Sequence, residues 1–219
     1  MSRVFLVRHG RSEANVAGVL AGRGESPLDS QGELDAADLG YRLAVVPLAL
    51  AVCSPMVRTR ATLTSLLRDR DIPTVYDEAL AECDYGDWTG RALSTLASDP
   101  LWKAVQSHPS AVRFPGGESM ADMSARAVRA VRGYAQELAS EQAMVVVTHG
   151  DLVKAVLADA LGMHLDAFQR IVIAPASLSV VAYAEGRPFV ERINDCGGSL
   201  DDLLPPPRDE AVPGGVTGR

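Results

Sequence analysis

The sequence contains little cysteine and no long hydrophobic run. Its three cysteines, Cys53, Cys83 and Cys196, are odd in number and widely spaced, and none belongs to a CxxC pair, which excludes a disulfide framework and a zinc ribbon. No apolar run approaches the roughly 20 residues that span a bilayer, and the first one ends in Arg-His-Gly rather than at a small-residue cleavage site. We therefore expect a protein of the reducing cytoplasm that has no membrane partner.

Positive charge is also in short supply. The 219 residues carry 21 Lys and Arg against 28 Asp and Glu, and the formal net charge of −7 opposes non-specific binding to nucleic acid. The sequence lacks a GxxxxGK(S/T) loop, a GxGxxG motif and an HExxH motif, so the main signs of nucleotide binding and of a zinc hydrolase are missing. We expect no nucleic-acid partner, no metal ion and no cofactor.

Strand and helix signals alternate along the chain, which predicts an α/β fold. Short apolar runs indicate buried strands, and capping residues followed by three-to-four apolar spacing indicate helices. The expected strands are 4–8, 49–53, 74–76, 144–147, 171–173, 178–183 and 189–193, and the expected helices are 30–45, 55–70, 120–138 and 151–161. The length suits one domain over 1–196, followed by a Pro- and Gly-rich tail over 197–219.

The segment 81–118 is the least regular part of the chain. Its glycines and prolines break it into loops and short helices, and we expect it to form a lid over the sheet. Two of the four histidines, His108 before a proline and His164 after a helix, are expected at the surface. The other two, His9 and His149, follow predicted buried strands and are candidates for a functional site.

Three strand-to-helix junctions carry polar groups suited to an anion. They are Arg8-His9-Gly10, the segment 54–58 that ends in Arg58, and His149-Gly150-Asp151. Because ligands of an open parallel sheet bind at the carboxyl ends of its strands, where all three junctions fall, these groups can meet. The start of each following helix adds N–H groups and a positive dipole end. Arg8 and His9 alone are better explained as a polar strand end in solvent, but the three junctions together predict a site for a tetrahedral dianion.

These motifs resemble those of the histidine phosphatase superfamily, the phosphoglycerate-mutase-like fold. The matching residues occur in the family's order and are 6–10 (LVRHG) with Ser12 and Asn15, 54–58 (SPMVR), Glu82 with 85–90 (YGDWTG), 114–119 (FPGGES) and 148–150 (THG). The resemblance implies a three-layer α/β/α fold with a mostly parallel central sheet. Within the family, the sequence is similar to an actinobacterial branch of phosphomutases and phosphatases.

The resemblance also implies a covalent mechanism. His9 would attack phosphorus and carry a phosphohistidine, and Glu82 would protonate the leaving alcohol and then activate water. Contacts to the phosphate or substrate would come from Arg8, Asn15, Arg58, His149 and Gly150, of which Arg8, Arg58 and His149 would also stabilise charge in the transition state. Without the resemblance, Glu82 is better explained as a lid carboxylate that faces solvent.

The sequence departs from the family's pattern at several positions. Arg11 stands where glutamate or glutamine is more common, Thr89 where glutamate is usual, and Asp151 where a second glycine is frequent. Arg11 would add positive charge near the pocket or just outside it, whereas the charge of Asp151 would oppose a phosphate unless the side chain faces away. Ser54 is expected to cap the helix that follows it.

A phosphatase is favoured over a mutase. The cofactor-dependent mutases have a longer basic insertion after the glutamate, whereas the segment 91–113 here contains only Arg91, Lys103 and Arg113 as basic residues. The expected function is a phosphomonoesterase for a small phosphorylated metabolite. A phosphoglycerate mutase and a non-catalytic phosphate-ligand-binding protein are the alternatives, and a homodimer is left open.

Overall fold

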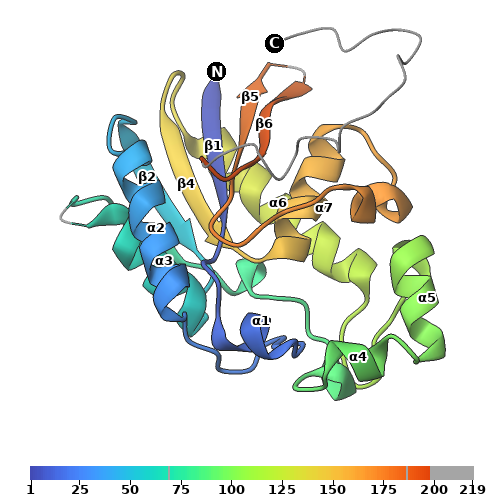
Figure 1. Cartoon of the computed structure of the whole chain (residues 1–219). Helices are drawn as coiled ribbons and strands as arrows, with labels where there is room; N and C mark the ends of the chain where they lie inside the picture. Colours follow the sequence, from blue (N-terminus) through green and yellow to red (C-terminus); the bar gives the residue numbers. More distant parts are fainter. Residues whose placement is uncertain (69, 186, 198–219) are drawn as a thin grey trace, which may run out of the picture.

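The computed structural model describes residues 1–68, 70–185 and 187–197. Its strands form one sheet in the order β3-β2-β4-β1-β5-β6 (Figure 1). They are β1 (Ser2–Arg8), β2 (Leu48–Cys53), β3 (Thr74–Tyr76), β4 (Ala143–Thr148), β5 (Leu178–Ala184) and β6 (Arg187–Asp195). Pairs among β1 to β4 are parallel, while β5 pairs antiparallel with both β1 and β6. The predicted mostly parallel sheet is confirmed, and the predicted tail lies, from residue 198 onward, outside the described residues.

Helices cover both faces of this sheet. On one face lie α2 (Ser30–Leu43) and α3 (Val57–Leu67), and on the other lie α6 (Met120–Glu137) and α7 (Gly150–Ala160) (Figure 1). The shorter helices are α1 (Glu13–Ala17), η1 (Glu78–Leu80), η2 (Gly86–Trp88), α4 (Leu93–Leu96), α5 (Pro100–Ser107), η3 (Pro109–Ala111) and η4 (Leu165–Arg170). In Figure 1, α1 and α4 lie beyond the end of the sheet at which β1 terminates. The three-layer α/β/α architecture is therefore confirmed.

Strand β4 shows why an uninterrupted apolar run suits this position. All six of its residues are buried. Met144 and Val146 belong to the core cluster that includes α6 and α7, while Val145 and Val147 belong to the cluster that includes α2 and α3. Successive side chains of a strand point to opposite faces, so a strand covered on both sides must be apolar at every position.

The predicted strand over 171–173 is wrong. Ile171 and Ile173 are buried and Val172 is exposed, so the side chains alternate as in a strand, but the segment takes no part in the sheet. The Ile173 carbonyl instead accepts a hydrogen bond from Nη1 of Arg8 at 2.6 Å. Three apolar residues are too few to separate a strand from an extended loop that packs against the core.

Helix α2 begins at its predicted start, Ser30, but with a different cap, whereas α3 begins later than predicted. Asp29 caps α2, because its carboxylate accepts a hydrogen bond from the backbone N–H of Gly32 at 2.7 Å. Helix α3 begins at Val57, two residues later than predicted, and Ser54 does not cap it. The segment 81–118 does break into loops and short helices as expected.

Candidate active site

His9 directly follows β1, and its backbone N–H and carbonyl are both hydrogen-bonded to neighbouring segments of the chain. Its N–H donates to the Thr148 carbonyl at 2.9 Å, and its carbonyl accepts from the Ala176 N–H at 3.1 Å. Its ring Nδ1 lies 2.7 Å from the Gly10 carbonyl oxygen. Because a carbonyl oxygen only accepts, Nδ1 carries the proton in this hydrogen bond, and Nε2 keeps its lone pair.

The surroundings of His9 favour the neutral ring. The residue is only 3% exposed, and burial, followed by the charges of Arg58 and Arg8, holds its pKa well below the ordinary value. Close packing fixes the turn that follows, because a Cβ at Gly10 would lie 2.5 Å from the Gly32 carbonyl oxygen. A neutral imidazole with an unprotonated Nε2 is the state that a nucleophile requires.

Arg58 is a buried guanidinium, 1% exposed, near the start of α3. Its Nη2 donates to the Gly22 carbonyl at 2.7 Å and its Nη1 to the Gly24 carbonyl at 3.2 Å. These bonds aim Nε at Nε2 of His9, 3.3 Å away. The positive charge therefore stands next to the atom on which we expect phosphoryl transfer to occur.

Arg8, at the end of β1, is half-buried on the other side of His9. One bond to the Ile173 carbonyl anchors its guanidinium, and its buried Nε has no hydrogen-bond partner among the described residues. Gly150 packs beside this side chain, since a Cβ there would lie 3.4 Å from Arg8 Nε, at van der Waals contact. A buried donor without a partner is suited to bind an anion.

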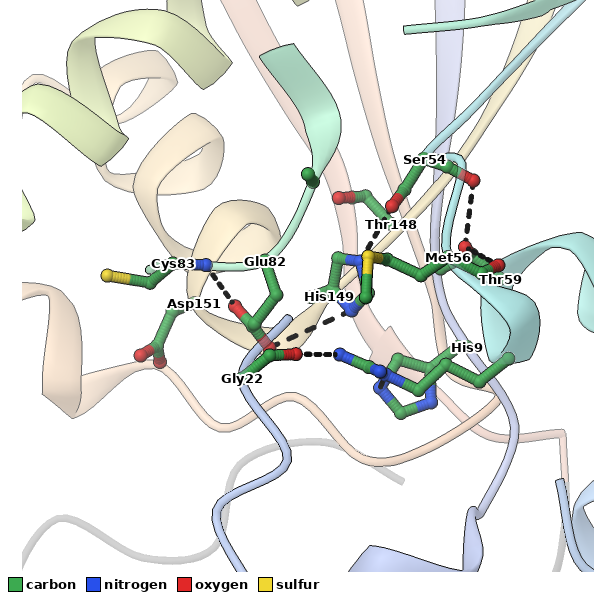
Figure 2. A network of polar contacts seen from close by, with 12 residues as sticks. His9, Gly22, Ser54, Met56, Thr59, Glu82, Cys83, Thr148, His149 and Asp151 are labelled. Atoms are coloured by element: carbon green, nitrogen blue, oxygen red, sulfur yellow. Dashed lines mark hydrogen bonds and ion pairs between the residues drawn. The ribbon is translucent and has the colours of Figure 1, made fainter. Parts of the chain in front are cut away.

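His149 is the N-cap residue of α7 and is fully buried. Its Nε2 lies 2.8 Å from the hydroxyl of Ser54, and its Nδ1 lies 3.7 Å from Oε2 of Glu82 without a hydrogen-bond partner among the described residues (Figure 2). Burial, followed by the influence of His9, holds the pKa of His149 well below its usual range. A neutral ring that accepts from the Ser54 hydroxyl carries its proton on Nδ1.

The two histidine rings lie close together. Their centroids are 5.3 Å apart at an interplanar angle of 62°, and Figure 2 shows Glu82 on the same side of both rings. The sequence separates them by 140 positions, but β1 and β4 are adjacent parallel strands in which Arg8 pairs with Thr148. Because these strands end side by side, the residues that follow them meet.

Glu82 contributes a carboxyl group to this cluster from the loop after η1. The Cys83 N–H donates to its Oε1 at 3.0 Å. Burial raises the pKa of Glu82 to about 7, and the negative charge of Asp151 contributes to the rise. A carboxyl group with a pKa near neutrality can both give and take a proton, as an acid–base catalyst must.

An ion pair and backbone contacts hold the loop that carries Glu82. Arg126 of α6 donates to both carboxylate oxygens of Glu118, at 2.6 and 3.0 Å, and to the carbonyls of Ala79, Ala81 and Glu82. Arg23 donates to the Glu82 carbonyl from a different loop. These contacts hold the backbone of the loop that carries Glu82, and the sequence motif FPGGES indicated them only through Glu118.

The charge of Asp151 was expected to oppose a phosphate unless the side chain faced away. Asp151 nevertheless lines the cavity. Its carboxylate accepts from the Tyr85 hydroxyl at 3.0 Å and lies 3.4 Å from Nζ of Lys154, which in turn donates to Gln169 at 2.9 Å. Sequence reasoning missed Tyr85, Lys154 and Gln169 as site residues. The only signal in the sequence was Asp151, which stands where the family frequently has a second glycine.

Asn15 lies at the cavity, whereas Arg11 lies outside it. Asn15 lines the cavity, but its Oδ1 accepts from the backbone N–H and hydroxyl of Ser12, so its amide is partly used to cap α1. Arg11 forms an ion pair with Asp29 at 2.7 Å and does not line the cavity. The positive charge of Arg11 therefore lies outside the pocket, paired with Asp29.

A cavity of about 430 Å³ joins these groups. The predicted residues that line it are Arg8, His9, Asn15, Arg58, Glu82 and Gly150, and the buried His149 lies behind them. His108 and His164 are exposed elsewhere, as expected. Within the described ranges, no group of three or more His, Cys, Asp or Glu side chains could hold a metal ion, and no helix has the length and apolarity to cross a membrane.

A neutral buried histidine, a buried and a half-buried arginine, and a carboxyl group with a raised pKa lie together on an α/β/α fold, an arrangement that can support phosphoryl transfer. The profile of one family, the histidine phosphatase superfamily (branch 1), matches residues 4–196. The chain belongs to this superfamily, whose members are phosphatases or mutases.

Individual relatives agree with this assignment. The probable phosphoglycerate mutase GpmB of Salmonella choleraesuis is 27% identical over 213 residues, which cover 96% of this chain and 99% of the relative. The solved structure of YhfR from Bacillus stearothermophilus is 28% identical, with a TM-score of 0.84, and the match covers 89% of this chain and 98% of that one. The α-ribazole phosphatase of Shigella flexneri, 24% identical with a TM-score of 0.79 over 89% and 96% of the two chains, shares the fold.

Proposed function

We propose that this protein is a phosphatase that hydrolyses a monoester of a small phosphorylated metabolite through a phosphohistidine on His9. The observation that carries the proposal is the set of nitrogen atoms around His9 Nε2. Nε of Arg58 already contacts Nε2, and Arg8 Nε and His149 Nδ1 are buried without hydrogen-bond partners in the described part of the chain. Buried polar atoms are normally satisfied, so these donors are suited to phosphoryl oxygens.

In the first step, the lone pair on Nε2 of His9 attacks phosphorus while the bond from phosphorus to the alcohol oxygen breaks. Arg8, Arg58 and His149 stabilise the negative charge on the non-bridging oxygens, and the proton of His9 stays on Nδ1, which donates it in a hydrogen bond to the Gly10 carbonyl. Glu82 starts protonated and gives its proton to the leaving alcohol, which its raised pKa permits.

In the second step, Glu82 is a carboxylate and takes a proton from water. The water oxygen then attacks phosphorus, the bond to Nε2 breaks, and inorganic phosphate leaves with Glu82 protonated again. Asn15 and the backbone of Gly150 line the same end of the cavity and are suited to further contacts with the phosphate. One carboxyl group thus serves both half-reactions.

A phosphoglycerate mutase is the second candidate, because a relative of full length carries that name. A mutase returns the phosphoryl group to a second hydroxyl instead of to water, and its bisphosphate needs a second anion site. Beyond Arg8 and Arg58, Lys154 is the one lysine or arginine among the described residues that line the cavity, and its ammonium group already contacts Asp151 and Gln169. Transfer to water is therefore favoured.

We extend the proposal to a metal-independent enzyme of the cytoplasm. Fixed protein charges supply the stabilisation that a metal ion would give, and Cys53 and Cys83 are buried thiols. A homodimer remains an expectation that light scattering on the purified protein tests directly.

The test is phosphate release from a panel of monoesters in the presence of EDTA. We expect activity in the unmodified protein and its loss in His9→Ala, with His108→Ala as the matched control because that histidine is exposed and lies outside the cavity. Undiminished activity in His9→Ala, or a requirement for added metal, would contradict the proposal.

A further inference from the structure

The catalytic cavity is much larger than a phosphate requires. Arg8, His9, Arg58 and Glu82 occupy one end of the space of about 430 Å³. A volume of this size is typical of pockets that enclose an entire small organic molecule. The remainder of the cavity must therefore be matched to the alcohol part of the substrate, and its lining specifies what that alcohol is.

Eleven apolar side chains, alongside polar ones, line this remaining part of the cavity. They come from three segments, namely the loop before α2, the stretch from η2 to just beyond η3, and the extended segment after η4. The side chains are Val19, Leu20, Ala21, Trp88, Leu93, Trp102, Val105, Phe114, Ile171, Val172 and Ile173. Apolar surface on a substrate would gain free energy by leaving water here.

The aromatic part of this wall has a fixed shape. Trp88 is 2% exposed and stacks on Trp102 with ring centroids 6.2 Å apart, and Phe114 meets Trp88 edge to face at 5.3 Å. Tyr85 meets Phe114 in the same manner at 4.9 Å. Trp88 and Phe114, each 2% exposed, pack against the half-buried Trp102 and fix its position, so Trp102 is the ring of this group that can offer a face to an aryl or branched alkyl group.

The charged groups at this end balance one another. Lys154 lies 3.4 Å from the carboxylate of Asp151 and donates to Gln169 at 2.9 Å, and its side chain is 18% exposed. Among the described lining residues, no other lysine or arginine lies beyond the phosphate-binding pair. A carboxylate or second phosphate on the substrate would lose its hydration and meet Asp151 without a free cation in exchange.

We propose that the alcohol this enzyme releases is a bulky, uncharged group with a large apolar surface, rather than a short carboxylic acid such as a glycerate. The inference deepens the proposed phosphatase function and rests on it. The phosphate end accepts any monoester, while the aromatic wall selects by apolar contact and the neutralised Lys154–Asp151 pair rejects a second anionic group. Gln106, exposed on α5 at the cavity, offers an amide for a hydroxyl or ether oxygen.

The first experiment compares kcat/KM for three phosphate esters of primary alcohols, so that leaving-group basicity differs little. They are 2-phenylethyl phosphate, glycerol 1-phosphate and 2,3-bisphosphoglycerate cleaved at its 3-position. We expect 2-phenylethyl phosphate to exceed each of the others by roughly 100-fold, the scale that a well-matched apolar pocket provides. Equal or better use of the acidic ester would overturn the inference and leave the phosphatase function standing, whereas no His9-dependent hydrolysis of any ester would overturn both.

Two pairs of variants test the same inference without depending on a single fold-sensitive position. Gln106→Lys adds a free cation at an exposed site and should raise the kcat/KM for the acidic ester relative to 2-phenylethyl phosphate by about 10-fold, whereas the uncharged Gln106→Met should not. Trp102→Ala should lower the kcat/KM for 2-phenylethyl phosphate by about 10-fold with little change for glycerol 1-phosphate, and Trp102→Phe should retain most of it. An unchanged preference in both Gln106→Lys and Trp102→Ala would contradict the inference.

Discussion

The two ends of the catalytic cavity are built from different kinds of structure. At the phosphate end, the functional residues follow directly from β1, β2 and β4, which are hydrogen-bonded neighbours in the sheet. His9, Arg58 and His149 there are at most 3% exposed. At the alcohol end, loops and short helices from distant parts of the chain supply the walls. The chemistry is thus fixed by the sheet, while selectivity belongs to segments that can vary without disturbing it.

This contrast predicts two kinds of mutational effect. A change at the phosphate end should lower the rate for every monoester, because all of them share the phosphoryl group. A change at the alcohol end should alter the preference among monoesters or the pH dependence. A substitution at one end that produced the effect expected of the other end would contradict this division of the cavity.

The largest effect is expected for Glu82→Gln. Alkyl phosphates, whose leaving alkoxide needs a proton, should lose about 10²–10⁴-fold in kcat/KM. With 4-nitrophenyl phosphate, whose leaving group needs no proton, the loss in the first step should be far smaller. Steady-state and burst kinetics on both esters measure this difference, and an equal loss for both would remove Glu82 from the role of acid.

Arg58→Gln should follow, with a loss of about 10²–10³-fold in kcat, the scale of removing one strong transition-state donor. The loss should be the same for alkyl and aryl esters, since in the proposed mechanism Arg58 stabilises the phosphoryl oxygens and not the alcohol. Arg60→Gln is the matched control two residues along α3, because Arg60 is exposed and lies over the Tyr76 ring. A loss that depends strongly on the alcohol would contradict the division between the two ends.

Ser54→Ala should cost less, about 10-fold in kcat/KM, because one hydrogen bond that sets the tautomer of His149 is removed. The effect should again be uniform across substrates. Thr64→Ala, an exposed hydroxyl on α3, serves as the control for generic loss of a side-chain hydrogen bond. Activity equal to that of the control would mean that Ser54 does not position His149.

The smallest effect, a shift rather than a loss, is expected for Asp151→Asn. The charge of Asp151 helps to raise the pKa of Glu82 to about 7, so its removal should lower that pKa. Glu82 must be protonated in the first step, and the alkaline limb of kcat/KM for alkyl esters should therefore move to lower pH, by roughly one unit. Asp159→Asn, farther along α7 and paired with Arg132, should leave the limb in place. A shift in the opposite direction would contradict the assignment.

The phosphate end could be predicted from the sequence because its residues sit at junctions with strong local signals. The apolar run before Arg8-His9-Gly10 and the one before His149 each end abruptly on polar groups, and parallel strands bring such ends together. All of the predicted residues gather around one cavity as a result. Glu82 is the exception, because only the family resemblance, and no local pattern, separated it from an exposed lid carboxylate.

The alcohol end could not be predicted in the same way. Its walls depend on which loops fold over the sheet, and no short-range spacing encodes the contact of Tyr85 with Asp151 or of Lys154 with Gln169. The segment 171–173 illustrates the difficulty, since its alternating apolar side chains fit a strand but pack as an extended wall that holds Arg8. Each of these features depends on packing between segments that are separated in the sequence.

The most direct test of the central claim is the detection of phosphate on His9 during turnover. Rapid quenching of the enzyme with a radiolabelled monoester under alkaline conditions should trap a protein-bound phosphoryl group that is labile in acid and stable in base, and peptide mapping should place it on His9. With radiolabelled 4-nitrophenyl phosphate, whose leaving group needs no proton, the label should accumulate further in Glu82→Gln, in which water is not activated. Turnover with no protein-bound label, or with label on another residue, would contradict the account.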